Sequence, residues 1–339
     1  MGSETSAARV ELLKMINGYW LTQAVYVAAK LGIADLVAKE PKTVQAIAAS
    51  CGTDEKSTYR LLRALASLGL FEEMEDGRFQ STPVGGLLRS DVPGSIRGVA
   101  LYSGDPEHYR AWGELLYSVQ TGERAFDRVF GKRVFDYMAE HPDVARTFDA
   151  AMTGYTVEVA GAIADNYDFS AIRKIVDVGG GAGTMLAQIL EANPAMTGTL
   201  VDLPHVIERA RGLLASRGLS GRCELVEGDF FQSVPAGGDA YILKWIIHDW
   251  EDERAIMILR NCRRAMSPSA RLLLAEAVVP PGNAPDFAKL LDLNMLVMTG
   301  GLERSEDEWK KLLQASGFKM EGFQPVHPMV SIIEGRIDD

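Results

Sequence analysis

The carboxyl-terminal half of the chain alternates between two hydrophobic patterns. Short runs of apolar or β-branched residues, typical of buried strands, are separated by segments whose apolar positions recur at helical spacing. The predicted strands are centred on Ile175, Leu200, Leu225, Ile242 and Leu273, with a final pair near 320–326 and 330–333. Regular alternation of strands and helices predicts an α/β domain with a mostly parallel sheet.

The amino-terminal part has helical spacing almost throughout. Residues 9–38 predict two helices, and the stretch Trp20–Ala29 is apolar on nearly every side. A helix with so small a polar face must be buried on several sides, and a second subunit could supply part of that cover. Two more helices, capped by Thr43 and by Thr53 or Asp54, precede a hairpin over 70–80. Helix, helix and hairpin in this order predict a winged helix-turn-helix.

A winged helix raises the alternative of a DNA-binding regulator. The candidate recognition helix carries Lys56, Arg60 and Arg63 against Asp54 and Glu55, which leaves a net charge of only +1. A helix that reads DNA normally has a clustered basic face for phosphate contacts. The pattern therefore favours a dimerisation or lid module over DNA binding.

The segment between the two patterned regions is helical and rich in aromatic residues. Between positions 106 and 165 they recur among apolar residues at helical spacing, so most belong to a core and some could wall a flat apolar pocket. We expect a winged-helix domain over 1–97, a helical linker over 98–168 and the α/β domain over 169–339.

Length and charge narrow the function classes. The 339 residues exceed what one core usually supports, and the formal net charge is −11. Such a charge argues against non-specific binding to nucleic acid or to anionic membranes. The sequence begins with no signal-peptide pattern and contains no apolar run of about 18 residues, which predicts a cytoplasmic protein.

A glycine-rich turn follows the strand at Ile175. Gly179, Gly180, Gly181 and Gly183 allow the backbone to take unusual dihedral angles and let a ligand approach closely. Such a turn after the first strand of a doubly wound sheet is a nucleotide site.

Two later strands each end in an acidic residue. Asp202 ends the second strand at the place where an acid reaches ribose hydroxyls, and Asp229 with Phe230 ends the third, suited to an adenine ring. No basic residue lies in the glycine turn to meet a pyrophosphate. The pattern therefore predicts an adenosine without phosphates, namely S-adenosylmethionine.

His248 is the candidate catalytic base. It lies where the apolar run of the fourth strand ends, at the same edge of the sheet as the glycine turn, and Asp249 follows it. An imidazole of ordinary pKa, about 6.5, is largely neutral near pH 7 and can remove a proton from a phenol, whose pKa is near 10. Glu276, which ends the fifth strand, or Glu303 could orient the ring. The alternative for Glu303 is helix capping.

These motifs resemble a known family. Val176-Asp177-Val178-Gly179-Gly180-Gly181, Val201-Asp202-Leu203-Pro204, Glu227-Gly228-Asp229-Phe230 and 243–250 are similar to small-molecule O-methyltransferases of the caffeic acid, acetylserotonin and hydroxyneurosporene type. The resemblance covers nearly the whole chain and includes bacterial enzymes acting on aromatic polyketides.

The resemblance implies a Rossmann-like α/β methyltransferase domain with an amino-terminal all-helical winged-helix domain that forms a homodimer. It implies methyl transfer from S-adenosylmethionine, which becomes S-adenosylhomocysteine, to a hydroxyl of a small aromatic secondary metabolite. It assigns four catalytic positions: His248, Asp249, Glu276 and Glu303. The implied cofactor contacts are Gly179, Gly180, Gly181, Asp202, Leu203, Gly228, Asp229, Phe230 and Lys244. The implied substrate contacts are Phe148, Met152, Trp245, Asp292, Asn294 and Met295.

Two alternatives to methyl transfer stay open. The first is that of relatives that keep the cofactor but catalyse decarboxylation, hydroxylation or pericyclic reactions. The second is a DNA-binding regulator with an adenosine-sensing domain. A metal-dependent mechanism is not expected, because no cluster of ligand-like residues surrounds His248 in the sequence.

Overall fold

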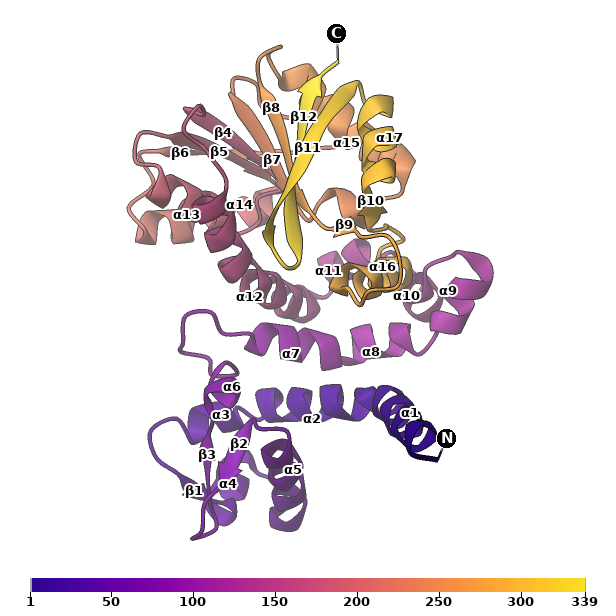
Figure 1. Cartoon of the computed structure of the whole chain (residues 1–339). Helices are drawn as coiled ribbons and strands as arrows, with labels where there is room; N and C mark the ends of the chain where they lie inside the picture. Colours follow the sequence, from indigo (N-terminus) through magenta and orange to yellow (C-terminus); the bar gives the residue numbers. More distant parts are fainter. Residues whose placement is uncertain (1, 339) are drawn as a thin grey trace. The chain divides into compact units, whose positions relative to one another are not determined.

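The computed structural model describes residues 2–338, which form two compact units (Figure 1). The first unit runs to Arg110 and includes Met138–Tyr155, whereas the second comprises Ala111–Tyr137 and the chain from Thr156 onward. The residues of the expected linker 98–168 are thus divided between the units.

The first unit is mainly helical. Its helices are α1 (Gly2–Ile16), α2 (Gly18–Lys30), α3 (Ile33–Leu36), α4 (Val44–Cys51), α5 (Glu55–Ser67), α6 (Pro83–Gly86) and α7 (Arg97–Gly104). The predicted hairpin is present as β2 (Phe71–Glu73) and β3 (Arg78–Ser81), and β1 (Lys42–Thr43) adds a third strand. The predicted caps are present, since Thr43 accepts from the Ala46 N–H and Asp54 from the Ser57 N–H.

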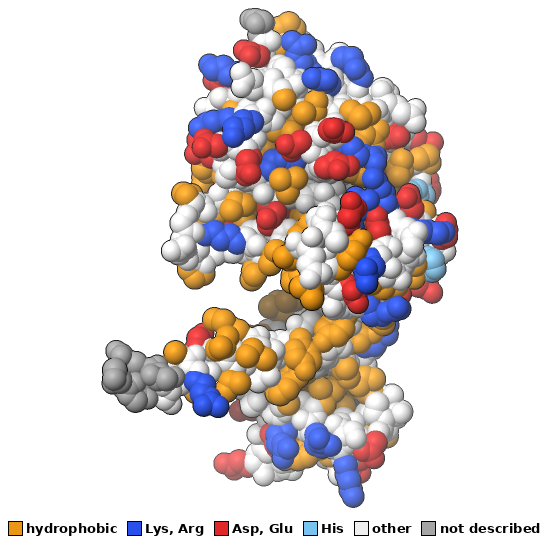
Figure 2. Space-filling view, turned by 90° about the vertical axis from the view of Figure 1, so that its right-hand side faces the viewer, with side chains coloured by type: hydrophobic (Ala, Val, Ile, Leu, Met, Phe, Trp, Pro, Cys, Tyr) orange, Lys and Arg blue, Asp and Glu red, His pale blue; other side chains and the backbone are white. Residues whose placement is uncertain are grey.

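Helices α1 and α2 leave a row of large apolar side chains exposed (Figure 2). The row contains Val10, Leu12, Leu13, Met15, Ile16, Tyr19, Trp20 and Leu21. The other face of α2 packs on α7, where Gly104 lies so close that a Cβ there would be 2.2 Å from the Tyr26 side chain. Helix α2 is therefore apolar toward its own unit and toward its surface.

The second unit is built on a seven-stranded sheet. Its strands are β4 (Lys174–Val178), β5 (Thr197–Asp202), β6 (Cys223–Glu227), β7 (Ala240–Lys244), β8 (Arg271–Glu276), β11 (Phe318–His327) and β12 (Val330–Ile337). Their order is β11-β12-β8-β7-β4-β5-β6, with only β11 and β12 antiparallel to their neighbours. The predicted mostly parallel sheet is confirmed. Its chain order reverses between β4 and β7, the place where doubly wound sheets bind ligands.

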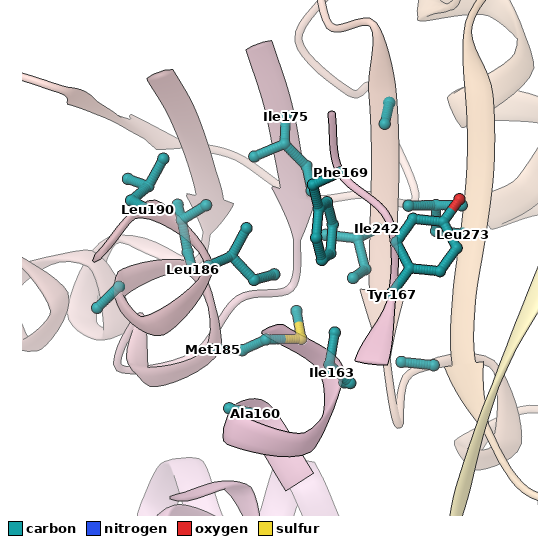
Figure 3. Packing of buried hydrophobic residues seen from close by; sticks show 14 of the residues in the cluster. Ala160, Ile163, Tyr167, Phe169, Ile175, Met185, Leu186, Leu190, Ile242 and Leu273 are labelled. Carbon is teal, nitrogen blue, oxygen red and sulfur yellow. The ribbon is translucent and has the colours of Figure 1, made fainter. Parts of the chain in front are cut away.

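Helices cover both faces of this sheet. On one face α12 (Pro142–Asn166), α13 (Thr184–Ala192) and α14 (Pro204–Ser216) bury side chains such as Ile163 and Leu186 against Ile175 and Ile242 (Figure 3). On the other face α15 (Asp252–Ala265) and α17 (Glu306–Ala315) form a second core that contains the fully buried Trp309 of α17. These cores hold the strands rigidly, so side chains at the strand ends have defined positions.

The remaining elements complete the two units. They are α8 (Pro106–Trp112), α9 (Leu115–Thr121), α10 (Ala125–Phe130), α11 (Val134–Glu140), α16 (Phe287–Met298), the short parallel pair β9 (Val278–Val279) and β10 (Arg304–Ser305), and the 3₁₀ turn η1 (Ile247–Asp249). Among residues 2–338, no helix combines the length and the apolar character that crossing a membrane requires.

Candidate active site

The glycine turn after β4 has the backbone that its sequence predicts. Gly179, Gly181 and Gly183 have φ angles of 71°, 59° and 81°, a region that L side chains rarely adopt. A Cβ on Gly180 would lie 2.6 Å from Asp177 Oδ2, so this position also has no room for a side chain. At Gly181, by contrast, no described atom lies within 4 Å of a Cβ, and the turn is open on that side.

The acids predicted to contact the cofactor lie at the same edge of the sheet. Asp202 ends β5, and its carboxylate accepts from the Gly181 N–H at 2.8 Å and the Leu203 N–H at 2.7 Å. Asp229, just beyond β6, accepts from the Phe231 N–H at 2.9 Å, and the Gly228 N–H donates to the Asp202 carbonyl. Open glycine backbone flanked by two fixed carboxylates fits a ligand with hydroxyl and amino groups and no phosphate.

Asp177 is a polar group at this edge whose importance the sequence motifs did not reveal. It is 1% exposed next to the last residue of β4, and neither carboxylate oxygen has a hydrogen-bond partner among residues 2–338. Burial raises the pKa of Asp177 to about 7, although the nearby Lys244 ammonium opposes the shift. An unpaired buried carboxyl beneath the glycine turn indicates a site whose polar contacts are completed by a ligand.

The segment that carries His248 leaves the sheet earlier than expected. Strand β7 ends at Lys244, so the expectation that His248 ends the strand is wrong. Trp245 has a φ of 52°, the one positive value among the described non-glycine residues, and it turns the chain into η1. Lys244 lies 4.1 Å from the centre of the Trp245 ring, and burial lowers its pKa to about 8.

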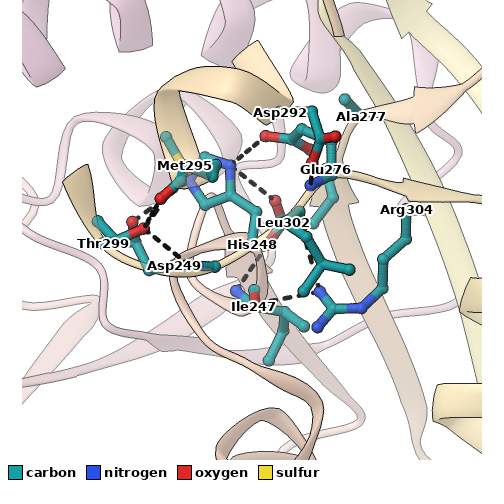
Figure 4. A network of polar contacts seen from close by, with 12 residues as sticks. Ile247, His248, Asp249, Glu276, Ala277, Asp292, Met295, Thr299, Leu302 and Arg304 are labelled. Carbon is teal, nitrogen blue, oxygen red and sulfur yellow. Dashed lines mark hydrogen bonds and ion pairs between the residues drawn. The ribbon is translucent and has the colours of Figure 1, made fainter. Parts of the chain in front are cut away.

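His248 is held by carboxylates from two distant segments (Figure 4). Its Nδ1 is 2.6 Å from Glu303 Oε1 and 3.9 Å from Glu276 Oε2, and its Nε2 is 4.0 Å from Asp249 Oδ1. Glu276 Oε1 accepts from the Ile246 and Ile247 N–H groups, which fixes the approach to η1. Glu303 therefore contacts the ring directly, and Glu276 holds the backbone beside it.

The capping alternative for Glu303 is wrong. Ser305 is the N-cap of α17, and Glu308 completes a capping box by accepting from the Ser305 N–H at 2.8 Å. The carboxylate of Glu303 is buried and turned toward His248 instead.

The charge state of His248 also differs from the expectation. Burial by itself lowers the pKa of the imidazole, but the charges of Glu303, Glu276 and Asp249 and the Glu303 hydrogen bond outweigh it and raise the pKa to about 10. The imidazole of ordinary pKa assumed from the sequence is therefore wrong. Burial in turn raises the pKa of Glu276 to about 7 and that of Asp249 to about 6.

His248 does belong to a cluster of residues of the types that bind metal ions, although the sequence predicted no such cluster around it. One nitrogen or oxygen from each of His248, Glu276 and Glu303 lies within 4.8 Å of the others, because the fold joins segments far apart in the chain. The described contacts engage Nδ1 of His248 and one oxygen of each carboxylate, whereas Glu276 Oε2 and Glu303 Oε2 are buried with no hydrogen-bond partner among residues 2–338.

The predicted substrate residues lie in both units. In the second unit Asp292 Oδ1 accepts from the Glu303 N–H at 2.9 Å, and Asn294 Oδ1 accepts from the Trp112 indole at 2.8 Å. Met295 is buried on the same helix, α16. Phe148 and Met152 belong to the part of α12 that lies in the first unit, and their role stays a prediction.

Two protein families match the chain. Residues 112–319 match an O-methyltransferase domain, and residues 13–91 match an O-methyltransferase dimerisation domain. A phenazine O-methyltransferase of Lysobacter antibioticus is 50% identical over 325 residues, which cover 96% of this chain and 95% of that protein. Other similar proteins include N-methyltransferases.

Solved structures agree with this likeness. The crystal structure of LaPhzM gives a TM-score of 0.94 at 49% identity, covering 97% of this chain and 99% of that one. The O-methyltransferase NcsB1 from neocarzinostatin biosynthesis, in complex with S-adenosylmethionine and 2-hydroxy-5-methyl naphthoic acid, gives 0.80 at 33% identity, covering 94% and 96%.

The fold, the domain matches and the cofactor bound to NcsB1 agree with the site geometry. The chain belongs to the O-methyltransferase family that carries an amino-terminal dimerisation domain, and it is a methyltransferase that uses S-adenosylmethionine.

Proposed function

We propose that this enzyme moves the methyl group of S-adenosylmethionine to a hydroxyl of a planar aromatic acceptor, with His248 as the general base. The observation that carries the proposal is the 2.6 Å contact between His248 Nδ1 and Glu303 Oε1. Because Nδ1 faces a carboxylate, Nε2 is the nitrogen that takes the proton of the acceptor hydroxyl.

The carboxylates match the base to its task. A phenol has a pKa near 10, and Glu303 and Glu276 raise the pKa of His248 to about the same value. Proton transfer from a phenol to the neutral imidazole is then nearly balanced in free energy, but near pH 7 only about a thousandth of a base with this pKa is neutral, so we expect the rate to rise with pH. An aliphatic hydroxyl is a far weaker acid, which is why the proposal specifies a phenolic one.

The cofactor supplies an electrophilic methyl group, and the residues at the carboxyl edge of the sheet supply its binding site. We assign the methionine end to the backbone of Gly179–Gly181, the ribose to Asp202, and the adenine to Asp229 and Phe230. The fixed carboxylate of Asp202 and the open side of Gly181 support this assignment. Positioning provides much of the remaining rate enhancement.

A hydroxylated phenazine is the first acceptor class to test. The 50% identical relative is named a phenazine O-methyltransferase, and aromatic side chains pack together close to the base in the chain. The Trp250 ring, two residues after His248, lies 5.9 Å from the Phe135 ring and 4.8 Å from the Phe231 ring. Polycyclic phenols of the naphthoate type are the second class, after the acid bound to NcsB1.

Methyl transfer to nitrogen is the competing function, because a phenazine-1-carboxylate N-methyltransferase is among the relatives. A ring nitrogen carries no proton to remove, so that reaction does not need the His248–Glu303 pair. The two reactions therefore respond differently to loss of the base.

The test uses methyl-labelled S-adenosylmethionine with a hydroxyphenazine, a naphthol and phenazine-1-carboxylate, and mass spectrometry locates the label. We expect label on a phenolic oxygen. In His248→Gln we expect kcat to fall by about 10²- to 10⁴-fold, with an unchanged dissociation constant for the cofactor. The control is His141→Gln, at an exposed position, which is expected to keep the wild-type kcat. Label on nitrogen only, or an unimpaired His248→Gln, would contradict the proposal.

We also infer that the enzyme is a homodimer. The apolar row on α1 and α2 lies within or next to residues 13–91, which match the dimerisation domain. Trp20, 58% exposed, is the test position. Light scattering is expected to give the mass of two chains for the wild type and of one chain for Trp20→Asp, whereas a monomeric wild type would refute the inference.

A further inference from the structure

Arg304 is a buried charge in the second unit that the proposed chemistry does not use. Its side chain is 1% exposed, whereas its ionic partner Asp252 is 65% exposed. Arg304 donates to Asp252 Oδ1 from Nε at 3.1 Å and from Nη2 at 2.8 Å. Burying a guanidinium costs free energy unless hydrogen bonds satisfy its donors. One ion pair with an exposed carboxylate is not enough to offset that cost.

The other donors of Arg304 bind backbone carbonyls of residues on either side of His248 in the chain, and Figure 4 shows the guanidinium beside Ile247. Nη1 donates to the Ile247 carbonyl at 3.3 Å, and Nη2 donates to the Trp250 carbonyl at 3.0 Å. Ile247 precedes His248 and Trp250 follows Asp249, so a single planar group binds both ends of the turn that carries the base. A guanidinium suits this role because its donors are fixed in one plane.

Arg304 also belongs to the segment that carries the partner of the base. Glu303 is its neighbour in the chain, and the Leu302 N–H donates to the His248 carbonyl at 2.9 Å. The guanidinium lies 5.3 Å from the centre of the Trp309 ring, and the indole donates to the carbonyl of Ala277, which follows Glu276. The contacts of Arg304 and Trp309 thus join the segments of His248, Glu303 and Glu276.

We propose that Arg304 is a positioning residue that sets the contact between His248 Nδ1 and the Glu303 carboxylate. The inference rests on the proposed role of His248 as the base. Without the planar guanidinium, η1 is held to β10 by fewer hydrogen bonds and the two segments move apart. The contact between the imidazole and the Glu303 carboxylate then becomes longer.

The titratable groups that face His248 come from three places. They are Glu303 before β10, Glu276 on β8 and Asp249 in the same turn, and Asp292 on α16 binds the Glu303 N–H. A change in the charge of Arg304 would mix with a change in geometry. Arg304→Lys keeps the charge and removes the planar fork, so it isolates the geometric effect.

The primary measurement is the titration of His248 by NMR on the full-length enzyme with labelled histidine, the signal being assigned with His248→Gln. We expect the pKa of His248 to be lower in Arg304→Lys by about one unit, because a carboxylate that moves away raises it less. The control is Arg263→Met, in which an exposed arginine that donates to the Gly317 carbonyl at the other end of α17 is lost. This variant is expected to leave the titration unchanged.

Kinetics gives a second readout. In Arg304→Lys we expect kcat for the identified acceptor to fall by about 10- to 100-fold with an unchanged KM for the cofactor, since the base is misplaced while the cofactor residues are not. An unchanged titration in a folded Arg304→Lys would overturn the proposal, even if its melting temperature falls. If that variant does not fold, Asp252→Asn decides in the same way, because it loosens the guanidinium from its exposed side.

The two proposals fail differently. A wild-type enzyme that transfers methyl to no hydroxyl would refute the proposed function, whereas the NMR titration would still report whether Arg304 sets the state of His248.

Discussion

At the scale of single residues, the site depends on one imidazole and the charges around it. Its base strength comes from its surroundings, because Glu303 at 2.6 Å and Glu276 at 3.9 Å more than offset the effect of burial. The same histidine on a surface would have a pKa near 6.5, so the fold and not the residue type decides its base strength.

The first prediction concerns Glu303→Gln. The amide can still contact the ring but carries no charge, so we expect the pKa of His248 to fall and the acid limb of the pH–rate profile to move to lower pH. Near pH 10, where the wild-type imidazole is also largely neutral, kcat should fall by about 100-fold because the base is weaker than the phenoxide it must form, whereas near neutral pH the larger neutral fraction of the variant offsets this loss. Rate profiles between pH 5 and 10 test this.

Glu306→Gln is the matched control, since Glu306 is exposed on α17 and pairs only with Lys310 in the described contacts. The assignment of Glu303 would be contradicted if both variants kept the wild-type acid limb.

At the scale of elements, the site is a junction between η1 and the turn that follows α16. The pair β9 and β10 aligns Arg304 with Val278, which brings Glu303 close to the end of β8. The turn lies so close to η1 that a Cβ on Gly301 would be 1.8 Å from the His248 carbonyl oxygen and 2.5 Å from the Asp249 carbonyl carbon. Both atoms are backbone, so neither can rotate away.

The second prediction is therefore that Gly301→Ala separates the two elements. We expect a loss of stability of about 2–4 kcal/mol, in the range of disruptive core changes, and a fall in kcat of about 100-fold from the displaced base. Urea unfolding and steady-state kinetics measure the two effects.

Gly212→Ala is the control, because this glycine lies inside α14 with no described atom within 4 Å of its Cβ position. We expect it to be neutral or to stabilise by about 1 kcal/mol, since alanine favours a helix. Equal behaviour of the two variants would show that the close approach at Gly301 is not needed.

At the scale of the whole molecule, buried carboxyls make stability depend on pH. Burial raises the pKa of Asp177 and Glu276 to about 7 and that of Asp249 to about 6, all above the values of an unfolded chain. Between about pH 4 and 7 the folded protein then binds more protons than the unfolded chain. The free energy of unfolding must fall as the pH rises through this window.

The third prediction follows from this sign. Without cofactor, the wild type should lose stability between pH 5 and pH 7, and Asp177→Asn should lose about 2 kcal/mol less, because the amide does not titrate. Asp165→Asn, at an exposed position, should behave as the wild type does. Urea unfolding at both pH values measures the difference, and equal losses in all three proteins would contradict the buried state of Asp177.

Local patterns determined much of the fold in advance. Strand positions, the hairpin at Asp76-Gly77, the caps Thr43 and Asp54 and the glycine turn all depend on neighbours within a few residues, so they are readable in the sequence. The parallel sheet then follows, because alternating strands and helices have few ways to pack. Placing acids at the ends of β5 and β6 required only this topology.

Tertiary structure alone decided how the base is held. His248 and Glu303 are 55 positions apart, and their contact depends on how two loops pack rather than on any local pattern. The raised pKa of His248, the cluster with Glu276 and the burial of Arg304 and Asp177 all follow from that packing, since desolvation and charge act through space. The sequence thus determined which residues reach the site, and the fold decided what each one faces.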